Sequence, residues 1–166
     1  MSSIIWPKKY LPATTDNFVS NETFIMGITT ERVWNNLANI SKWETYYDNC
    51  SQITPPVSGP FLAKGDHFSF STFGFPPLQC EVLESIAPST NSAGRIAWEA
   101  CQDGDDETYF RAYHAWLIEE TEWGAVRILT QETQVGKPAV QMANTKPNPM
   151  LLGHQKWVDG LVEASR

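Results

Sequence analysis

The sequence predicts one α+β domain in which a run of antiparallel strands is followed by a long C-terminal helix. Three observations predict this class. Residues 67–134 form successive segments of alternating apolar and polar side chains separated by turn residues, which is typical of an antiparallel meander. Residues 149–164 carry apolar side chains at helical spacing. The length of 166 residues suits a single domain that spans residues 1–166.

The N-terminal part of the chain predicts an arm, a strand and a helix. Residues 1–16 are rich in Pro, Lys and Thr and are expected to form an extended arm. Residues 17–26 alternate as a first strand. Thr29 or Thr30 then suits the cap of a helix, whose buried stripe is Val33, Leu37 and Ile40. A short helical or irregular segment follows at residues 43–47.

Five segments in the middle of the chain predict most of the sheet. They are residues 67–75, 78–86, 95–101, 109–118 and 125–134. In the first of them, Phe68, Phe70 and Thr72 share one face. Pro and Gly residues at positions 55–60 and 74–77 mark loops.

The last two strands predict a hairpin whose inward residues can be assigned. Arg127 and Gln131 are expected to face outward, so the inward residues of their strand are Val126, Ile128, Thr130 and Glu132. The inward residues of the partner strand are Phe110, Ala112, His114 and Trp116. A hairpin tip near Glu122 would place His114 opposite Thr130, with Glu132 on the diagonal.

The end of the chain predicts a short helix and then a long one. Pro138 opens the short helix, and residues 146–149 stop it. Asn148 is a suitable N-cap, and Pro149 suits the first position of the long helix. The apolar stripe of the long helix is expected to be Leu151, His154, Val158 and Leu161, flanked by Trp157.

Composition excludes several classes of function. The net charge is −7, and the 12 Lys and Arg residues form no cluster, whereas binding to nucleic acid or to an anionic membrane surface requires clustered cations. No apolar run has the length of a signal peptide core or of a spanning helix. We therefore expect a cytoplasmic protein with no nucleic-acid partner and no membrane span. The sequence does not fix the oligomeric state and is compatible with a monomer or a homodimer.

The sequence contains no recognisable metal or cofactor motif. Cys50, Cys80 and Cys101 are far apart and odd in number, which predicts reduced thiols rather than disulfides or a CxxC metal site. The three His residues stand alone, without the HxxxH or HxH spacing of metal ligands. A P-loop, a GxGxxG loop and a GxSxG elbow are also missing. We therefore expect neither a metal nor a cofactor.

Several short motifs resemble those of the START/Bet v 1-like superfamily, the polyketide cyclase/dehydrase and lipid-transport group. The motif Val33-Trp34-x-x-Leu37-x-x-Ile40-x-x-Trp43 resembles its first helix and the Trp that follows. Residues 95–98 (Arg-Ile-Ala-Trp) resemble one of its middle strands, and residues 114–118 and 130–136 resemble its final hairpin. The resemblance covers roughly residues 17–164, and its strength lies in the order and spacing of the motifs.

This resemblance implies a helix-grip fold, in which a curved antiparallel sheet of about seven strands wraps around the C-terminal helix. It also implies two short helices after the first strand and a cavity between the sheet and the long helix. Relatives include lipid carriers, hormone receptors, cyclases and aromatases, and activators of heat-shock chaperones. The resemblance therefore does not fix a function, because function depends on the residues of the site.

His114 and Glu132 are candidates for acid–base chemistry. An inward His is more commonly structural, but its pKa near neutrality suits a general acid or base. An inward carboxylate is costly to bury unless it is paired or protonated. Glu132 is therefore expected to accept a hydrogen bond from His114, to bond a ligand, or to reach water at a strand end. A raised pKa of Glu132 beside His114 would make a proton-transfer pair.

Two further polar residues are candidates, together with a set of wall residues. His154 lies on the apolar stripe of the long helix and faces either the core or a ligand. Tyr46 is a candidate hydrogen-bond donor near the cavity mouth. The expected walls, which would either line a pocket or only fill the core, are Trp43, Tyr47, Phe68, Phe70, Thr72, Trp98, Trp116, Ile128, Thr130, Met150 and Trp157.

These features support three hypotheses from different classes. The first is a protein that binds a small hydrophobic molecule, aromatic or polyketide-like, in an internal cavity. The second is a cofactor-free cyclase, dehydratase or isomerase whose acid–base residues are drawn from His114, Glu132, His154 and Tyr46. The third is a protein-interaction module similar to the chaperone activators, which an exposed apolar patch without a cavity would favour.

Overall fold

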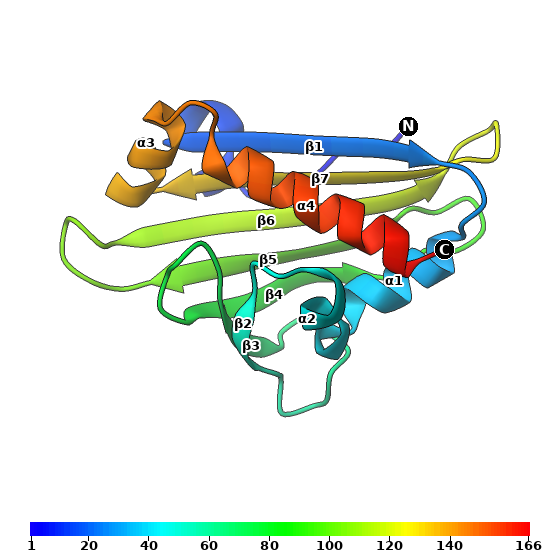
Figure 1. Ribbon diagram of the computed structural model, residues 1–166, viewed down its shortest axis with the longest axis horizontal. Helices are drawn as coiled ribbons and strands as arrows, with labels where there is room; N and C mark the ends of the chain where they lie inside the picture. Colours follow the sequence, from blue (N-terminus) through cyan, green and yellow to red (C-terminus); the bar gives the residue numbers. More distant parts are fainter.

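Seven antiparallel strands form one curved sheet in the order β1-β7-β6-β5-β4-β3-β2 (Figure 1). The computed structural model describes residues 1–166. The strands are β1 (Asn17–Ile25), β2 (Ser51–Thr54), β3 (His67–Ser71), β4 (Leu78–Ile86), β5 (Gly94–Gln102), β6 (Phe110–Glu120) and β7 (Val126–Val135). Apart from β1, which lies beside β7, each strand pairs with its neighbour in the sequence. The predicted meander is therefore confirmed.

Four helices complete the fold. They are α1 (Thr30–Ala38), α2 (Trp43–Tyr46), α3 (Lys137–Asn144) and α4 (Pro149–Ala164). Figure 1 shows α4 crossing one face of the sheet, with α1 and α2 beside its C-terminal half. This arrangement is the α+β helix-grip fold that the sequence predicted, with two short helices after the first strand. None of the helices is both long and apolar enough to cross a bilayer.

The predicted helix caps are present. Thr29 caps α1 by accepting a hydrogen bond from the backbone N–H of Arg32. Asn148 caps α4 in the same way through the N–H of Met150. The assignment of Leu151 to the buried stripe of α4 is wrong, because this side chain is 37% exposed. The buried face begins one residue earlier, at Met150, and the other predicted members of the stripe, His154, Val158 and Leu161, are buried as expected.

Two strands differ from the prediction. β2 was not expected, because its four residues are mostly exposed and show no apolar alternation. β3 ends at Ser71 and not at Phe75, since Phe73 has a positive φ of 51° and leaves the extended conformation. The segment between β3 and β4 is therefore a loop that carries two Phe side chains, Phe73 and Phe75.

The register of the β6–β7 hairpin corrects one expectation. His114 lies directly opposite Glu132, and Thr130 lies opposite Trp116. The reason is that the hairpin turn is centred on Trp123 and not on Glu122, and a shift of the tip by one residue moves the pairing by two. The inward set is unchanged, because a shift of two residues keeps every side chain on its predicted face.

Side chains pack on both faces of the sheet. On the inner face, the rings of Trp43, Trp98 and Trp157 form one cluster, with centroids of neighbouring rings 5.0–6.1 Å apart. On the outer face, the N-terminal arm forms two 3-10 turns, and its Tyr10 stacks on Tyr113 at 5.6 Å. The arm thus covers residues of β5, β6 and β7 that face away from α4.

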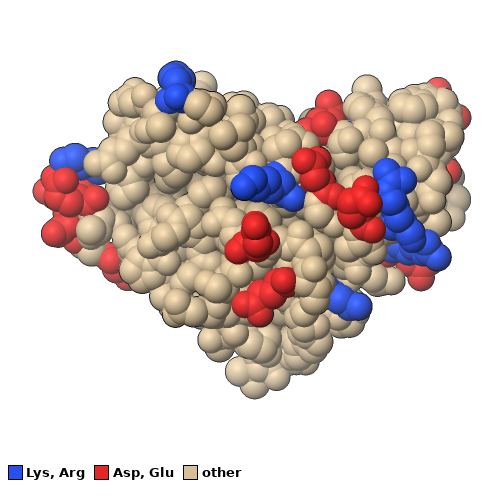
Figure 2. Space-filling model, in the orientation of Figure 1, with Lys and Arg blue, Asp and Glu red and all other residues tan.

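Charged side chains are interspersed on the molecular surface. In the view of Figure 2, Lys and Arg lie singly or next to Asp and Glu, and large uncharged areas separate them. The outward Arg127, for example, is 8% exposed and pairs with Glu22 and Glu119.

Candidate functional site

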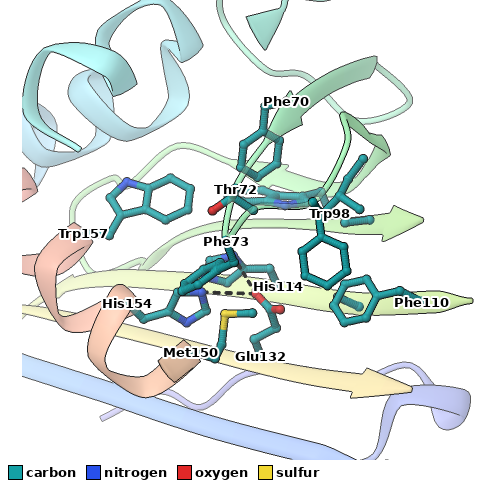
Figure 3. Close-up of a pocket in the computed structure, with 14 residues that line it drawn as sticks. Phe70, Thr72, Phe73, Trp98, Phe110, His114, Glu132, Met150, His154 and Trp157 are labelled. Carbon is teal, nitrogen blue, oxygen red and sulfur yellow. Dashed lines mark ion pairs between the residues drawn. The ribbon is translucent and has the colours of Figure 1, made fainter. Parts of the chain in front are cut away.

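A small pocket lies between the sheet and the N-terminal half of α4 (Figure 3). Its volume accessible to the centre of a water molecule is about 20 Å³, which is room for one water. Most of its 14 lining residues are apolar, and the large ones are Phe70, Phe73, Phe75, Leu78, Trp98, Phe110, Met150 and Trp157. The ionisable groups in the lining are His114, Glu132 and His154.

These three ionisable side chains converge on one carboxylate oxygen. His114 Nδ1 lies 3.1 Å from Glu132 Oε2, and His154 Nε2 lies 3.4 Å from the same atom. The residues come from β6, β7 and α4, and the cross-strand pairing of His114 with Glu132 sets the first contact. All three are at most 5% exposed. They form an acid–base cluster with almost no contact with bulk water.

Neighbouring groups hold each end of this cluster. His114 Nε2 lies 2.8 Å from the hydroxyl of Thr130, which also bonds the Ala115 carbonyl. On the other side, the Gln134 amide donates a hydrogen bond to Glu132 Oε1. His154 differs, since its Nδ1 is buried and has no hydrogen-bond partner. Hydrogen bonds therefore fix the side chains of His114 and Glu132, whereas Nδ1 of His154 has no hydrogen-bond partner in the protein.

Burial sets the protonation of the cluster. It raises the pKa of Glu132 to about 7, against the lowering effect of the Gln134 hydrogen bond. It also lowers the pKa of His154 to about 3. The pKa of His114 is held well below its usual value by burial and by the nearby His154. At neutral pH both imidazoles are thus uncharged, and Glu132 is the group that exchanges a proton.

Two His and one Glu are also a possible ligand set for a metal ion. The candidate ligand atoms of the three residues lie within 4.8 Å of one another. However, the imidazoles of His114 and His154 are stacked, with centroids 4.4 Å apart and planes only 11° from parallel. An ion bound by both nitrogens would have to lie near both ring planes, and stacked planes do not meet. The stacked rings therefore do not present their nitrogens to one common ion.

The structure gathers most of the predicted acid–base residues and separates one of them. His114, Glu132 and His154 meet in the pocket. Tyr46 does not line it, because its hydroxyl donates to the carbonyl of Asn36 on α1. Thr130 is a neighbour of His114 but is not exposed to the pocket.

The expected wall residues divide into two groups. Those that line the pocket are Phe70, Thr72, Trp98, Met150 and Trp157. Those that pack elsewhere in the core are Trp43, Tyr47, Phe68, Trp116 and Ile128. Tyr47 is an example of the second group, since its ring stacks on Trp157 at 4.4 Å and helps to fill the space beneath α4.

Sequence reasoning missed several lining residues and one supporting residue. Phe110 and Ala112 were placed on the inward face but were not identified as site residues. Phe73 and Phe75 lie in a loop, where no periodicity indicates direction. Gln134 shares the parity of Glu132 along β7, and this signal could have identified it as a second inward polar residue.

Solved structures with the same fold place the chain among known proteins. A hypothetical protein from Helicobacter pylori, jhp0584, is 42% identical, with a TM-score of 0.93 over 100% of this chain and 98% of the other. DynU16, from the dynemicin biosynthetic locus, has a TM-score of 0.59 at 12% identity, over 89% of this chain and 46% of its own. The Bet v 1-like protein Ara h 8.0201 has a TM-score of 0.54 at 8% identity, over 89% and 93%.

The more distant structures show the fold alone, whereas the H. pylori protein shows a family relationship. No protein-family model and no curated protein matches the sequence. The likeness to Ara h 8.0201 agrees with the helix-grip architecture described above. The chain has a Bet v 1-like fold and belongs to the same protein family as jhp0584 of Helicobacter pylori.

Proposed function

We propose that this protein binds a small, largely apolar molecule in the pocket and transfers a proton to or from it through Glu132. The observation that carries the proposal is the His114–Glu132–His154 cluster at the wall of an aromatic pocket. A general acid–base group works best when its pKa lies near the operating pH. The pKa of about 7 for Glu132 meets this condition.

The surroundings of Glu132 support acid–base chemistry without a cofactor. Two uncharged imidazoles contact its carboxylate, and their low pKa values leave Glu132 as the group that takes up and releases the proton. Aromatic walls keep bulk water away, so the proton moves between the substrate and the cluster. The corresponding reaction class is an isomerisation, cyclisation or dehydration that begins with proton transfer at a carbon next to a carbonyl group.

The cavity volume disfavours a carrier of bulky ligands. A site for a drug-sized molecule usually has a volume of roughly 300–1,000 Å³, whereas this pocket accommodates about one water molecule. The aromatic side chains expected to line a large cavity instead fill most of it. We therefore place the enzyme hypothesis before simple storage or transport, and we restrict the ligand to a small molecule.

Deuterium exchange tests the proposal directly. Acetophenone, 2′-hydroxyacetophenone and propiophenone each carry slowly exchanging protons next to a carbonyl group. We expect the protein to accelerate deuterium incorporation from D₂O into at least one of them, as measured by ¹H NMR. Glu132→Gln should abolish the acceleration, because a neutral amide is too weak an acid and too weak a base to transfer the proton, and His114→Gln should reduce it.

A matched control is Glu99→Gln. Glu99 is a partly buried carboxylate on β5 that pairs with Lys9, away from the pocket. This variant should exchange deuterium like the unmodified protein. Equal exchange in Glu132→Gln and Glu99→Gln, or no acceleration with any of the three ketones, would contradict the proposal.

A further inference from the structure

The pocket admits a ligand only if part of its wall moves, because it has room for about one water molecule. Nearly all of the wall belongs to strands β3 to β7 and to α4. The exceptions are Thr72, Phe73 and Phe75, which lie in the loop between β3 and β4. Movement is easiest in this loop, since no ladder of backbone hydrogen bonds holds it.

Phe73 is the member of this loop that lies against α4. A Cβ atom at Gly153 would be only 2.2 Å from the ring of Phe73, so the ring rests directly on the helix backbone. The same ring lies edge-on to His154, with centroids 6.1 Å apart. A benzene-sized group therefore already fills the space next to the acid–base cluster, and this group belongs to the protein itself (Figure 3).

The backbone of Phe73 is in a conformation that a Phe residue rarely adopts. Its φ of 51° lies in the left-handed region, where side chains other than Gly are disfavoured. Local bonds from Asn49 hold it there: the Asn49 side-chain oxygen accepts from the Phe73 N–H, and the Asn49 carbonyl accepts from the Thr72 hydroxyl. The bonds from Asn49 thus hold the ring in place through a backbone conformation that Phe disfavours.

His154, whose ring lies beside this position, has one nitrogen without a hydrogen-bond partner. His154 is 2% exposed, its Nε2 faces Glu132, and its Nδ1 has no hydrogen-bond partner. When Nε2 carries the proton that points at the carboxylate, Nδ1 is an acceptor. A buried acceptor is stabilised by a donor, so a ligand hydroxyl that reaches Nδ1 would be favoured over an apolar group of the same shape.

We infer that the pocket is a site for one phenol-type ring, which takes the place of the Phe73 ring and bonds His154 Nδ1 through its hydroxyl. This inference rests on the proposed function for the location of the site, and it adds the class of ligand. An apolar protein cavity of about 150 Å³ is enough to bind benzene. Removal of a Phe ring beside an existing small cavity produces a space of this order.

The test uses Phe73→Gly with phenol, benzene and cyclohexanol as probes. Glycine removes the ring and accepts the positive φ without strain. We expect phenol to bind Phe73→Gly at least tenfold more tightly than the unmodified protein in calorimetry. Benzene and cyclohexanol should bind more weakly than phenol, and only phenol should shift the ¹⁵N signal of His154 Nδ1.

Phe61→Gly is the matched control, because Phe61 is a 52% exposed loop residue that does not line the pocket. It should bind phenol no better than the unmodified protein. Equal affinity in the two glycine variants would overturn the inference, and so would equal binding of cyclohexanol and phenol by Phe73→Gly. If Phe73→Gly does not fold, Phe73→Leu removes the ring but keeps apolar bulk, and the same comparison applies with a smaller gain.

The outcomes also separate this inference from the proposed function. Tight phenol binding by Phe73→Gly without deuterium exchange in any ketone would retain the ring site and remove the proton-transfer role of Glu132. Exchange that depends on Glu132, with no effect of Phe73→Gly on phenol affinity, would retain the proposed function and remove the ring site.

Discussion

The side-chain amide of Gln134 donates a hydrogen bond to Glu132 Oε1, and this bond ends a chain of amides that begins at α4. Asn148 accepts from the Met150 N–H, so its amide nitrogen must point at Asn17. Asn17 in turn donates to the Gln134 oxygen. Because a backbone N–H can only donate, the helix cap orients every amide in the chain, and Glu132 Oε1 receives a donor.

Gln134→Leu should therefore raise the pKa of Glu132 above its value of about 7. The Gln134 hydrogen bond favours the ionised carboxylate, and its loss leaves burial unopposed. The measurement is a pH titration of the Glu132 carboxyl carbon by ¹³C NMR. Gln131→Leu is the control on the same strand, since Gln131 faces outward and bonds Ser20. An unchanged pKa in Gln134→Leu would show that the amide chain does not act on Glu132.

Stability should rise with pH between about pH 5 and about pH 6. In this interval the unfolded chain binds protons on His114 and His154 that the folded protein excludes. The folded protein keeps one proton on Glu132 that the unfolded chain has released. Unfolding is thus accompanied by the net uptake of one proton at the residues of this cluster. The free energy of unfolding should therefore rise by roughly 1 kcal/mol per pH unit.

Glu132→Gln should make this pH dependence steeper, because the opposing proton of Glu132 is removed and both imidazoles still differ between the two states. His154→Gln should make it shallower. Urea unfolding at several pH values measures both slopes, and the comparison cancels contributions from groups outside the cluster. Identical slopes in the three proteins would mean that the cluster does not titrate as described.

The acid–base cluster was partly predictable from the sequence. Two-residue periodicity placed His114 and Glu132 on the inward face of one hairpin, and helical periodicity placed His154 on the buried stripe. Periodicity does not give the exact register, which depends on the conformation of the turn at Trp123. The contact between His154 and Glu132 also requires the docking of α4 on the sheet, and this is a tertiary feature.

The loop residues of the pocket were not predictable in the same way. The position of Phe73 depends on bonds to Asn49 and on the absence of a side chain at Gly153, both distant in sequence. Cavity size likewise depends on the orientation of rings such as Tyr47 and Trp157, which stack and fill the space that the resemblance suggested would be open. Aromatic content predicts that rings line the site, but it does not predict the volume that remains between them.

Addition of Zn²⁺, Mn²⁺ or Co²⁺ should leave the melting temperature unchanged. The stacked imidazoles of His114 and His154 do not direct their nitrogens at a common point in both ring planes. Scanning calorimetry with each ion, and with EDTA as a reference, measures the effect. A metal-dependent increase that disappears in His154→Gln would contradict this prediction and show that the rings turn to bind an ion.

Two glycines of α4 should respond differently to replacement by alanine. At Gly160 a Cβ would lie 2.1 Å from the backbone oxygen of Tyr46, so α2 and α4 would have to separate. Gly160→Ala should therefore destabilise the protein by about 1–3 kcal/mol, the usual range for overpacking.

At Gly153 the Cβ would meet the ring of Phe73, which a loop holds and which can swing away. Gly153→Ala should therefore cost less stability than Gly160→Ala in urea unfolding. If Gly153→Ala is the more destabilising change, the Phe73 ring is fixed as firmly as the backbone around Gly160. The wall formed by Phe73 would then not open by rotation of that side chain, and a ligand would have to enter by movement of the whole loop between β3 and β4.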